Sequence, residues 1–213
     1  MRKLNVLFFT AVMLFLSACS TNTPLAGKYK GELRFSAWEL LTAELILLED
    51  STFYYSSRPD ENSEFTAYAG QWRLQGKTLR LDAGHEWQLW LKPGRNGLEV
   101  LDVDQKPVKG SNKLIMKLNE ESELFSAPAN IKGSFRHYAD ASYFSFCGSG
   151  LQLLVITEGA NAELERSYFQ QLETDETEAL TVSVFGRVVR EQEQENASMK
   201  LSISRLNHRA NCR

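Results

Sequence analysis

Hydrophobic and polar residues alternate along much of the chain after residue 26, and turn-forming residues interrupt the alternation at short intervals. In the first half, residues 44–48 and 52–55 flank the polar turn Glu49-Asp50-Ser51, which predicts a β-hairpin. No stretch of helical period interrupts the series of short strands. The strands are predicted at 44–48, 52–55, 65–74, 77–82, 87–91, 98–103 and 113–118. Short strands at this spacing predict an antiparallel barrel or sandwich.

The second half combines strands with one helix. Residues 161–172 are predicted as a helix, because apolar side chains recur there every four positions and Asn161 stands at the N-cap position. The recurring side chains are Leu164, Tyr168 and Leu172. Strands are predicted at 131–146 (one long strand or a bent hairpin), 152–157, 180–189 and 199–206, with a polar loop at 190–196. Strands, one helix and two further strands follow each other in the order of a five-stranded OB-fold barrel.

Residues 119–130 separate the two halves. They are acidic at first and then rich in small residues, with a proline at 128, as is typical of a joint between domains. We therefore expect a linker at 119–130, one domain at 27–118 and a second at 131–213. The expected fold class is mainly β.

The start of the chain has a different composition. Arg2 and Lys3 precede an apolar stretch that ends in Leu16-Ser17-Ala18-Cys19. The stretch is too short for a comfortable membrane span and ends in small residues, as secretory signals do. It resembles the signal sequence of bacterial lipoproteins, in which the cysteine becomes the lipidated first residue. The alternative is an ordinary signal peptide that is cleaved at a nearby Ala or Ser.

The lipoprotein resemblance implies that residues 1–18 are removed, that Cys19 carries the lipid, and that 19–26 form a short tether. The residue after the cysteine is Ser20 and not an Asp, which resembles the outer-membrane address of Gram-negative lipoproteins. We therefore expect a lipid-anchored protein on the periplasmic face of the outer membrane. Nothing after Cys19 is apolar for long enough to cross a bilayer, so the expected contact with the membrane is through lipid, with palmitate among its acyl chains.

Loss of Arg2 and Lys3 with the signal sequence changes the formal charge from −3 to about −5. An acidic exported protein lacks the basic face that phosphate contacts require, so nucleic acid is not an expected partner. Cys147 and Cys212 remain after Cys19 is lipidated, and an even pair in an exported protein predicts a disulfide. The alternative is a pair of metal-binding thiolates, for which no further ligands stand nearby.

Candidates for catalysis and metal binding are few. The three histidines at 85, 137 and 208 have no Cys or His at ligand spacing, so no metal or other cofactor is expected. Ser149 lies between two glycines without the spacing of a nucleophile elbow and predicts a turn. Asp140, inside an aromatic segment, is expected to be a buried hydrogen-bond acceptor. We therefore expect a protein that is not an enzyme.

The residues also resemble the NlpE-like family of outer-membrane lipoproteins, which are described as copper-resistance or envelope-stress lipoproteins. The matching segments are Gly27 to Leu33, Gly70-Gln71-Trp72, Gly133 to Ala141, and Leu164-Glu165 with Tyr168, followed by Gly186 and Cys212. The resemblance implies a lipocalin-like barrel followed by an OB-fold domain. Where the family has Cys-x-x-Cys, this chain has Phe35 and Trp38. Neither side chain binds a soft metal or cycles as a redox pair, so a copper role that depends on this motif does not transfer.

Aromatic residues concentrate in the first half. Packing in the barrel core is the expected role of its tryptophans. The alternative is an aromatic mouth that binds an apolar ligand or a partner protein. The residues of this candidate ligand site are Phe35, Trp38, Trp72, Trp87 and Trp90.

These observations predict a non-enzymatic lipoprotein of the NlpE type that senses or buffers envelope stress through contacts with an envelope protein. Three alternatives stay open: a lipocalin-like carrier of a small apolar ligand, an inhibitor of hydrolases, and a copper-homeostasis protein.

Overall fold

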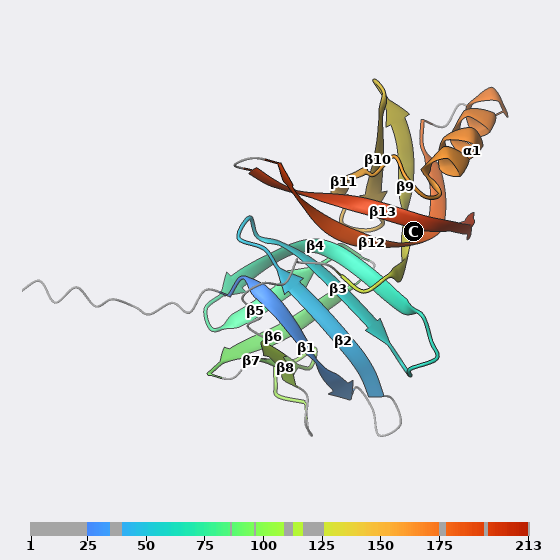
Figure 1. Ribbon diagram of the computed structural model, residues 1–213. Helices are drawn as coiled ribbons and strands as arrows, with labels where there is room; N and C mark the ends of the chain where they lie inside the picture. The colour runs from blue at the N-terminus through green and yellow to red at the C-terminus, as the bar shows by residue number, and fades with distance from the viewer. Residues whose placement is uncertain are drawn as a thin grey trace, which may run out of the picture.

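The computed structural model describes residues 25–34, 40–85, 87–95, 97–108, 113–116, 126–174, 178–193 and 196–212 of the 213-residue chain. Figure 1 shows two β bodies packed against each other, with the early strands in one and the late strands and the helix α1 in the other. In the described part of the chain, no helix has the length and apolar character that a membrane span requires.

The first body is a closed antiparallel barrel of eight strands. Each strand pairs with the next along the chain, and β1 pairs with β8, with Tyr29 opposite Met116. The strands are β1 (Gly27–Arg34), β2 (Leu40–Leu47), β3 (Thr52–Arg58), β4 (Phe65–Gln75), β5 (Thr78–Asp82), β6 (Gln88–Gly94), β7 (Gly97–Leu101) and β8 (Lys113–Met116). Eight antiparallel strands closed in this way form a lipocalin-like barrel, which confirms the fold predicted for the first half.

Side chains fill the interior of the first barrel. Because successive side chains of a strand point to opposite faces, Leu79 and Leu81 of β5 are fully buried inside while Arg80 faces outward. The large interior side chains from the other strands include Tyr29, Leu45, Phe53, Tyr55 and Leu91, each 1% exposed or less. A barrel of eight strands is just wide enough for side chains to fill, and those of the described strands pack into one buried cluster.

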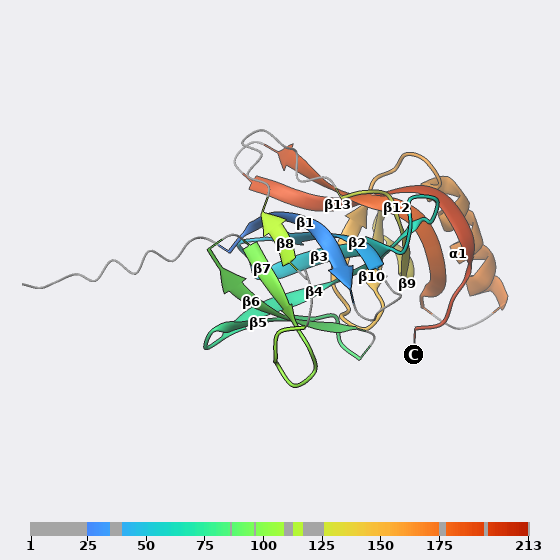
Figure 2. The same cartoon turned by 90° about the horizontal axis from the view of Figure 1, so that it is seen from below.

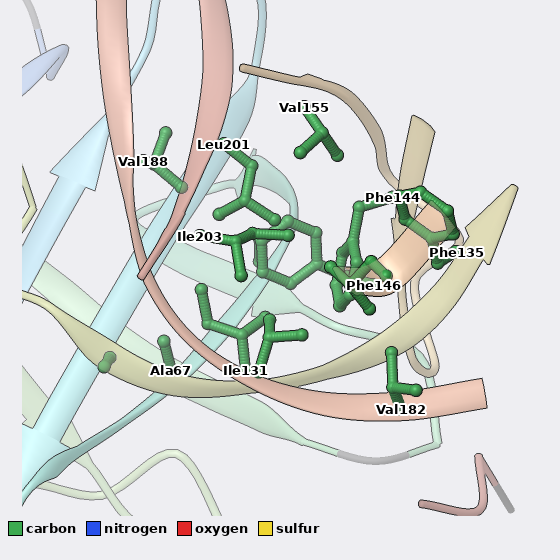
Figure 3. Close-up of a cluster of buried hydrophobic side chains, with 14 of the residues drawn as sticks. Ala67, Ile131, Phe135, Phe144, Phe146, Val155, Val182, Val188, Leu201 and Ile203 are labelled. Atoms are coloured by element: carbon green, nitrogen blue, oxygen red, sulfur yellow. The ribbon is translucent and has the colours of Figure 1, made fainter. Parts of the chain in front are cut away.

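The second body is a closed barrel of five strands. The order around it is β9, β10, β11, β13, β12 and back to β9, and the β11–β13 pair is parallel. Its elements are β9 (Ala129–Tyr138), β10 (Ala141–Phe146), β11 (Gln152–Val155), α1 (Asn161–Thr174), β12 (Leu180–Glu193) and β13 (Asn196–Arg209). The helix lies between the third and fourth strands, as predicted for an OB-fold barrel. Figure 3 shows its core, in which Phe135, Phe144 and Phe146 pack against aliphatic side chains of β12 and β13.

Four details differ from the sequence-based expectations. Residues 139 and 140 form a two-residue turn between β9 and β10, with φ of +49° and +64°, so Asp140 is exposed at the turn and is not a buried acceptor. The first N–H groups of α1 donate to the carbonyl of Ala160, so Asn161 is the first helical residue and not the N-cap. The helix buries Leu164 and Tyr168, but Leu172 is 40% exposed.

The fourth difference is the expected polar loop at 190–196. β12 continues to Glu193 and β13 starts at Asn196, so the two strands form one long hairpin. Pairing between the two strands satisfies the backbone hydrogen bonds of polar residues as well as of apolar ones. The polar composition of 190–196 therefore did not predict a loop correctly. Figures 1 and 2 show this hairpin extending from the second barrel across the first.

The two barrels share a hydrogen-bonded strand pair and part of a core. β4 of the first barrel runs parallel to β9 of the second, with Phe65 opposite Ala129 and Thr66 opposite Asn130. Four outward-facing side chains of β2, β3 and β4 belong to the core cluster of the second barrel: Ile46, Tyr54, Ala67 and Ala69. Ala67 is visible among the second barrel's side chains in Figure 3. The predicted linker at 119–130 is described only from Ser126 onward, and β9 begins at Ala129.

Replacing Gly84 by alanine tests the contact between the barrels. Gly84 and Gly76 both have a left-handed backbone, with φ of +74° and +63°, so alanine is strained at either position. A Cβ atom at Gly84 would also overlap the backbone carbonyl of Gly148 in the second barrel, whereas nothing lies within 4 Å of a Cβ at Gly76. In urea denaturation we expect Gly84→Ala to lower the free energy of unfolding by about 1–3 kcal/mol more than Gly76→Ala does. Equal losses in the two variants would contradict the contact.

Candidate functional site at the joint of the barrels

The predicted disulfide between Cys147 and Cys212 is present and closes a loop of 65 residues. It connects the residue after β10 to the end of β13, with Cα atoms 5.2 Å apart, within the usual range for a disulfide. Cys147 is buried and Cys212 is exposed. The bridge therefore holds the C-terminal end of β13 against the turn that follows β10.

That turn is one of the places where the second barrel touches the first. Residues 147–150 form a tight turn in which the Gly150 N–H donates to the Phe146 carbonyl (3.0 Å), as the two glycines around Ser149 predicted. Gly148 and Gly150 have φ of +79° and +66°. The Gly148 carbonyl lies against Gly84 of the first barrel, so close that a Cβ atom at position 84 would overlap it. The disulfide is thus one residue away from a backbone contact between the two barrels.

A cavity of about 600 Å³ lies between the barrels. Its apolar wall comes from both of them: Leu48, Tyr54 and Ala69 from the first, and Leu153, Val188 and Met199 from the second. Glu49 and Asp50, in the turn between β2 and β3, also line it and are exposed. A second cavity of about 440 Å³, lined by residues that include Arg73, Gly84 and Gly148, shares Leu151 and Gln152 with the first.

Tyr54 lines the larger cavity and is buried, with 3% of its surface exposed. Its ring contacts Phe146 edge-on, with centroids 6.4 Å apart, next to the disulfide turn. Ser126 lies beside the Tyr54 hydroxyl, but its Oγ donates to the Val188 carbonyl (3.3 Å) and accepts from the Val188 N–H (2.9 Å). Within the described structure the Tyr54 hydroxyl has no hydrogen-bond partner. Burial raises the pKa of this phenol far above its ordinary value.

A polar network closes the other side of the joint. Glu64, before β4, accepts from the Arg205 guanidinium of β13 at 2.9 Å and from the Asn130 amide at 2.9 Å. Asn207 donates to the Asn130 carbonyl oxygen at 2.7 Å. The hydrogen bond from Arg205 is the main cause of a lowered pKa of Glu64. These groups are exposed or half-buried, so they orient the barrels more than they stabilise the fold.

The predicted aromatic ligand site does not form one pocket in the described residues. Trp87 stacks on Tyr68 (centroids 5.3 Å apart) and on Tyr55 (4.5 Å) and thereby covers the barrel core. Trp72 donates its indole N–H to the Leu48 carbonyl at 3.0 Å. Trp90 points outward, where Arg80 lies over its ring at 5.3 Å. Phe35 and Trp38, like Cys19, lie outside the described residues, so their roles stay predictions.

The described residues contain no group of three or more His, Cys, Asp or Glu side chains that would hold a metal ion. His137 lies near Ser142 (3.1 Å) and Glu165 (3.3 Å), but Ser142 is 2% exposed and donates to Glu165 at 2.8 Å. Ser142 is buried, so a substrate could not reach its Oγ atom, and its hydrogen bond to Glu165 is a structural link between β10 and α1.

Sequence patterns did not predict the residues of the joint. Glu64 and Arg205 are 141 positions apart in the chain. Tyr54 lies between two other aromatic residues that face into the first barrel, so residue type does not distinguish it from them. The one available signal was the alternation in β3: if Phe53 and Tyr55 point into the barrel, Tyr54 is an apolar side chain on the outer face.

These features define a class: a two-barrel β protein in which a lipocalin-like barrel docks on a disulfide-closed OB domain. Residues 125–212 match the family described as the NlpE C-terminal OB domain. This match confirms the predicted resemblance to the NlpE-like family.

The chain has distant relatives among known proteins. The chain is 28% identical over 149 residues to lipoprotein NlpE of Escherichia coli (strain K12), which covers 68% of this chain and 61% of that protein. The match thus spans about three fifths of the relative's length. The crystal structure of the Cpx pathway activator NlpE from Escherichia coli has 23% identity and a TM-score of 0.37, and covers 89% of this chain and 98% of that one. A putative lipoprotein from Shewanella oneidensis has 22% identity and a TM-score of 0.38, and covers 45% of this chain and 91% of that one.

Replacing Tyr54 by phenylalanine tests whether its hydroxyl is buried without a partner. Such a hydroxyl costs about 1–3 kcal/mol, so we expect Tyr54→Phe to raise the free energy of unfolding by about 1 kcal/mol. Tyr29 is the matched control, because its buried phenol donates to the Leu25 carbonyl at 2.7 Å. Tyr29→Phe is expected to lower the free energy by about 1 kcal/mol in the same urea titration. A loss of stability in Tyr54→Phe would show that its hydroxyl is satisfied.

Proposed function

We propose that this protein is a lipoprotein of the bacterial outer membrane that reports envelope stress by contact with another envelope protein. One observation carries the proposal: the Cys147–Cys212 bridge lies one residue from the backbone contact of Gly148 with the first barrel. The oxidation state of two thiols is thereby linked to how the barrels meet. The relative that is described as a Cpx pathway activator supports a signalling role for this two-barrel protein.

The anchor in this proposal is lipid on Cys19. Arg2 and Lys3, the short apolar stretch and the small residues before Cys19 support it, as does the name of the Escherichia coli relative, a lipoprotein. Ser20, in place of an Asp, favours the outer membrane. A tether of a few residues would keep the first barrel near the membrane and leave the second available to a partner.

The proposed signal is the loss of the disulfide. In the chain-entropy model a bridge that closes 65 residues stabilises a domain by about 4 kcal/mol, a large part of the stability of a small domain. Reduction would release the end of β13 and loosen the 147–150 turn, which would weaken the contact with Gly84. The partner would then recognise a surface that the docked barrels cover.

The copper role is not part of this proposal. Phe35 and Trp38 stand where the family has its cysteine pair, and neither side chain is a metal ligand. A carrier role inside the first barrel is not part of it either, because the described interior side chains of that barrel pack into one cluster.

Removing one cysteine tests the redox link. Cys212 is exposed, so Cys212→Ser breaks the bridge with little change in packing. We expect it to lower the free energy of unfolding by about 4 kcal/mol and to raise the output of an envelope-stress reporter in cells. Reduction of the wild-type protein is the matched control and should give the same stability as Cys212→Ser. An unchanged melting temperature together with an unchanged reporter would refute the link.

Replacing Cys19 by serine tests the anchor separately. Labelled palmitate should enter the wild-type protein and not Cys19→Ser, and only the wild type should sediment with outer-membrane vesicles. Incorporation of palmitate into Cys19→Ser, or recovery of the wild type as a free protein, would refute the anchor without affecting the redox link.

A further inference from the structure

We propose that the cavity between the barrels is a binding site for a cationic amphiphile, a molecule with one apolar chain and an ammonium head group. The site is distinct from the interior of the first barrel, where a lipocalin-like fold would hold a ligand. Space for a ligand lies instead at the joint, where a partly open cavity of about 600 Å³ lies between the outer face of the first barrel and β11, β12 and β13. This volume is within the usual range for small-molecule sites.

The wall of the cavity favours an apolar chain. The side chains that line it from the two barrels are Leu48, Leu153, Val188 and Met199. Ala69 also lines it, and its small side chain occupies little of the space. Met199 and Leu153 are half-buried, so part of their apolar surface is open to the cavity. Covering that surface with an alkyl chain is favourable by about 25 cal/mol for each Å² removed from water.

The polar groups of the cavity favour a cation with N–H donors. Glu49 and Asp50 put two carboxylates at the turn that lines it, and no Lys or Arg is among the lining residues that the structure describes. Asp50 Oδ1 already accepts hydrogen bonds from the Thr52 N–H (2.9 Å) and from the Thr52 hydroxyl. We therefore assign the carboxylate of Glu49 to the head group of the ligand. Tyr54 lines the same wall with its ring, because its hydroxyl oxygen is fully buried and out of reach of a ligand in the cavity.

The position of the cavity suits a ligand that comes from a membrane. Ala26 and Gly27, at the start of β1, form part of its wall. Ala26 stands seven positions after Cys19, so a lipid at Cys19 would hold the cavity within about 25 Å of the bilayer surface. This step alone rests on the proposed anchor. The ligand would stabilise the docked barrels, because both of them contribute to its site.

The test uses the full chain with Cys19→Ser, so that no detergent is needed and a failure of the lipid anchor cannot affect the result. Decylamine, decanol and decanoate, each below its aggregation concentration, share one chain and differ in head group. Binding is measured by calorimetry and by the fluorescence of Trp72, whose indole donates to Leu48 in the cavity wall. We expect one decylamine per chain, with at least tenfold weaker binding of decanol and still weaker binding of decanoate.

Two variants locate the site. Met199→Trp and Leu153→Trp fill the cavity from β13 and from β11, and each should weaken decylamine binding at least tenfold. Leu74→Trp, at an exposed position of β4 outside the cavity, is the matched control and should bind as the parent does. Glu49→Gln should weaken decylamine several-fold and leave decanol unchanged. The melting temperature of each variant is compared first, so that the two cavity variants give an answer if either one folds.

Three results would overturn the proposal. Equal binding of the three ligands would refute the cationic class. Unchanged decylamine binding in a folded Met199→Trp or Leu153→Trp protein would refute the location. Binding of many decylamine molecules per chain, with no effect of any variant, would show adsorption to the acidic surface only.

Discussion

The packing of the first barrel's outer face on the second barrel is the constraint on which the rest of the structure depends. A strand in a closed barrel buries one face and usually leaves the other to water. On β2, β3 and β4 the outer face carries Ile46, Tyr54, Ala67 and Ala69, all of them buried in the core of the OB domain. The parallel pairing of β4 with β9 satisfies backbone groups at the same place. The two barrels therefore share a core and a strand pair, and a change in one barrel reaches the other through them.

This shared core brings three chemically different features together. The disulfide turn approaches the first barrel at Gly84 because no Cβ atom intervenes on either side. Tyr54 reaches Phe146 from the opposite barrel, and its hydroxyl is left without a partner. The cavity exists because two convex barrels meet along one face and cannot fill the space where they diverge. Redox state, docking and a ligand site would in this way influence one another over short distances, without a long path through the fold.

Local patterns predicted most of the elements. Alternation identified seven of the eight strands of the first barrel and missed β1 (Gly27–Arg34), and the strand–helix–strand order identified the OB topology, since both depend on which face of each element is apolar. Errors occurred where local pattern and tertiary context disagree. Asp140 stands between aromatic residues, yet it occupies a turn, because the strands of 131–146 need a reversal and an Ala-Asp pair accepts positive φ there. The polar residues 190–193 are strand, because pairing with β13 satisfies their backbone.

The candidate site was harder to predict than the fold. The cysteine pair was recognisable, because two cysteines remain after the expected lipidation of Cys19 and such an even pair predicts a disulfide in an exported protein. The tryptophans attracted attention by their chemistry, yet the structure places Trp87 over the barrel core and Trp90 on the outside. Glu64 and Arg205 have no local signature, since any exposed carboxylate and guanidinium look alike in a sequence.

The sequence by itself determined which side chains lie on a common face of each strand, that one helix interrupts the second barrel, and that Cys147 and Cys212 are paired. Only the tertiary structure decided which outer face becomes an interface. The alternation of a strand states that Tyr54 and Ala67 face away from the barrel, but the free energy of burying them depends on a surface that the chain supplies more than sixty residues later.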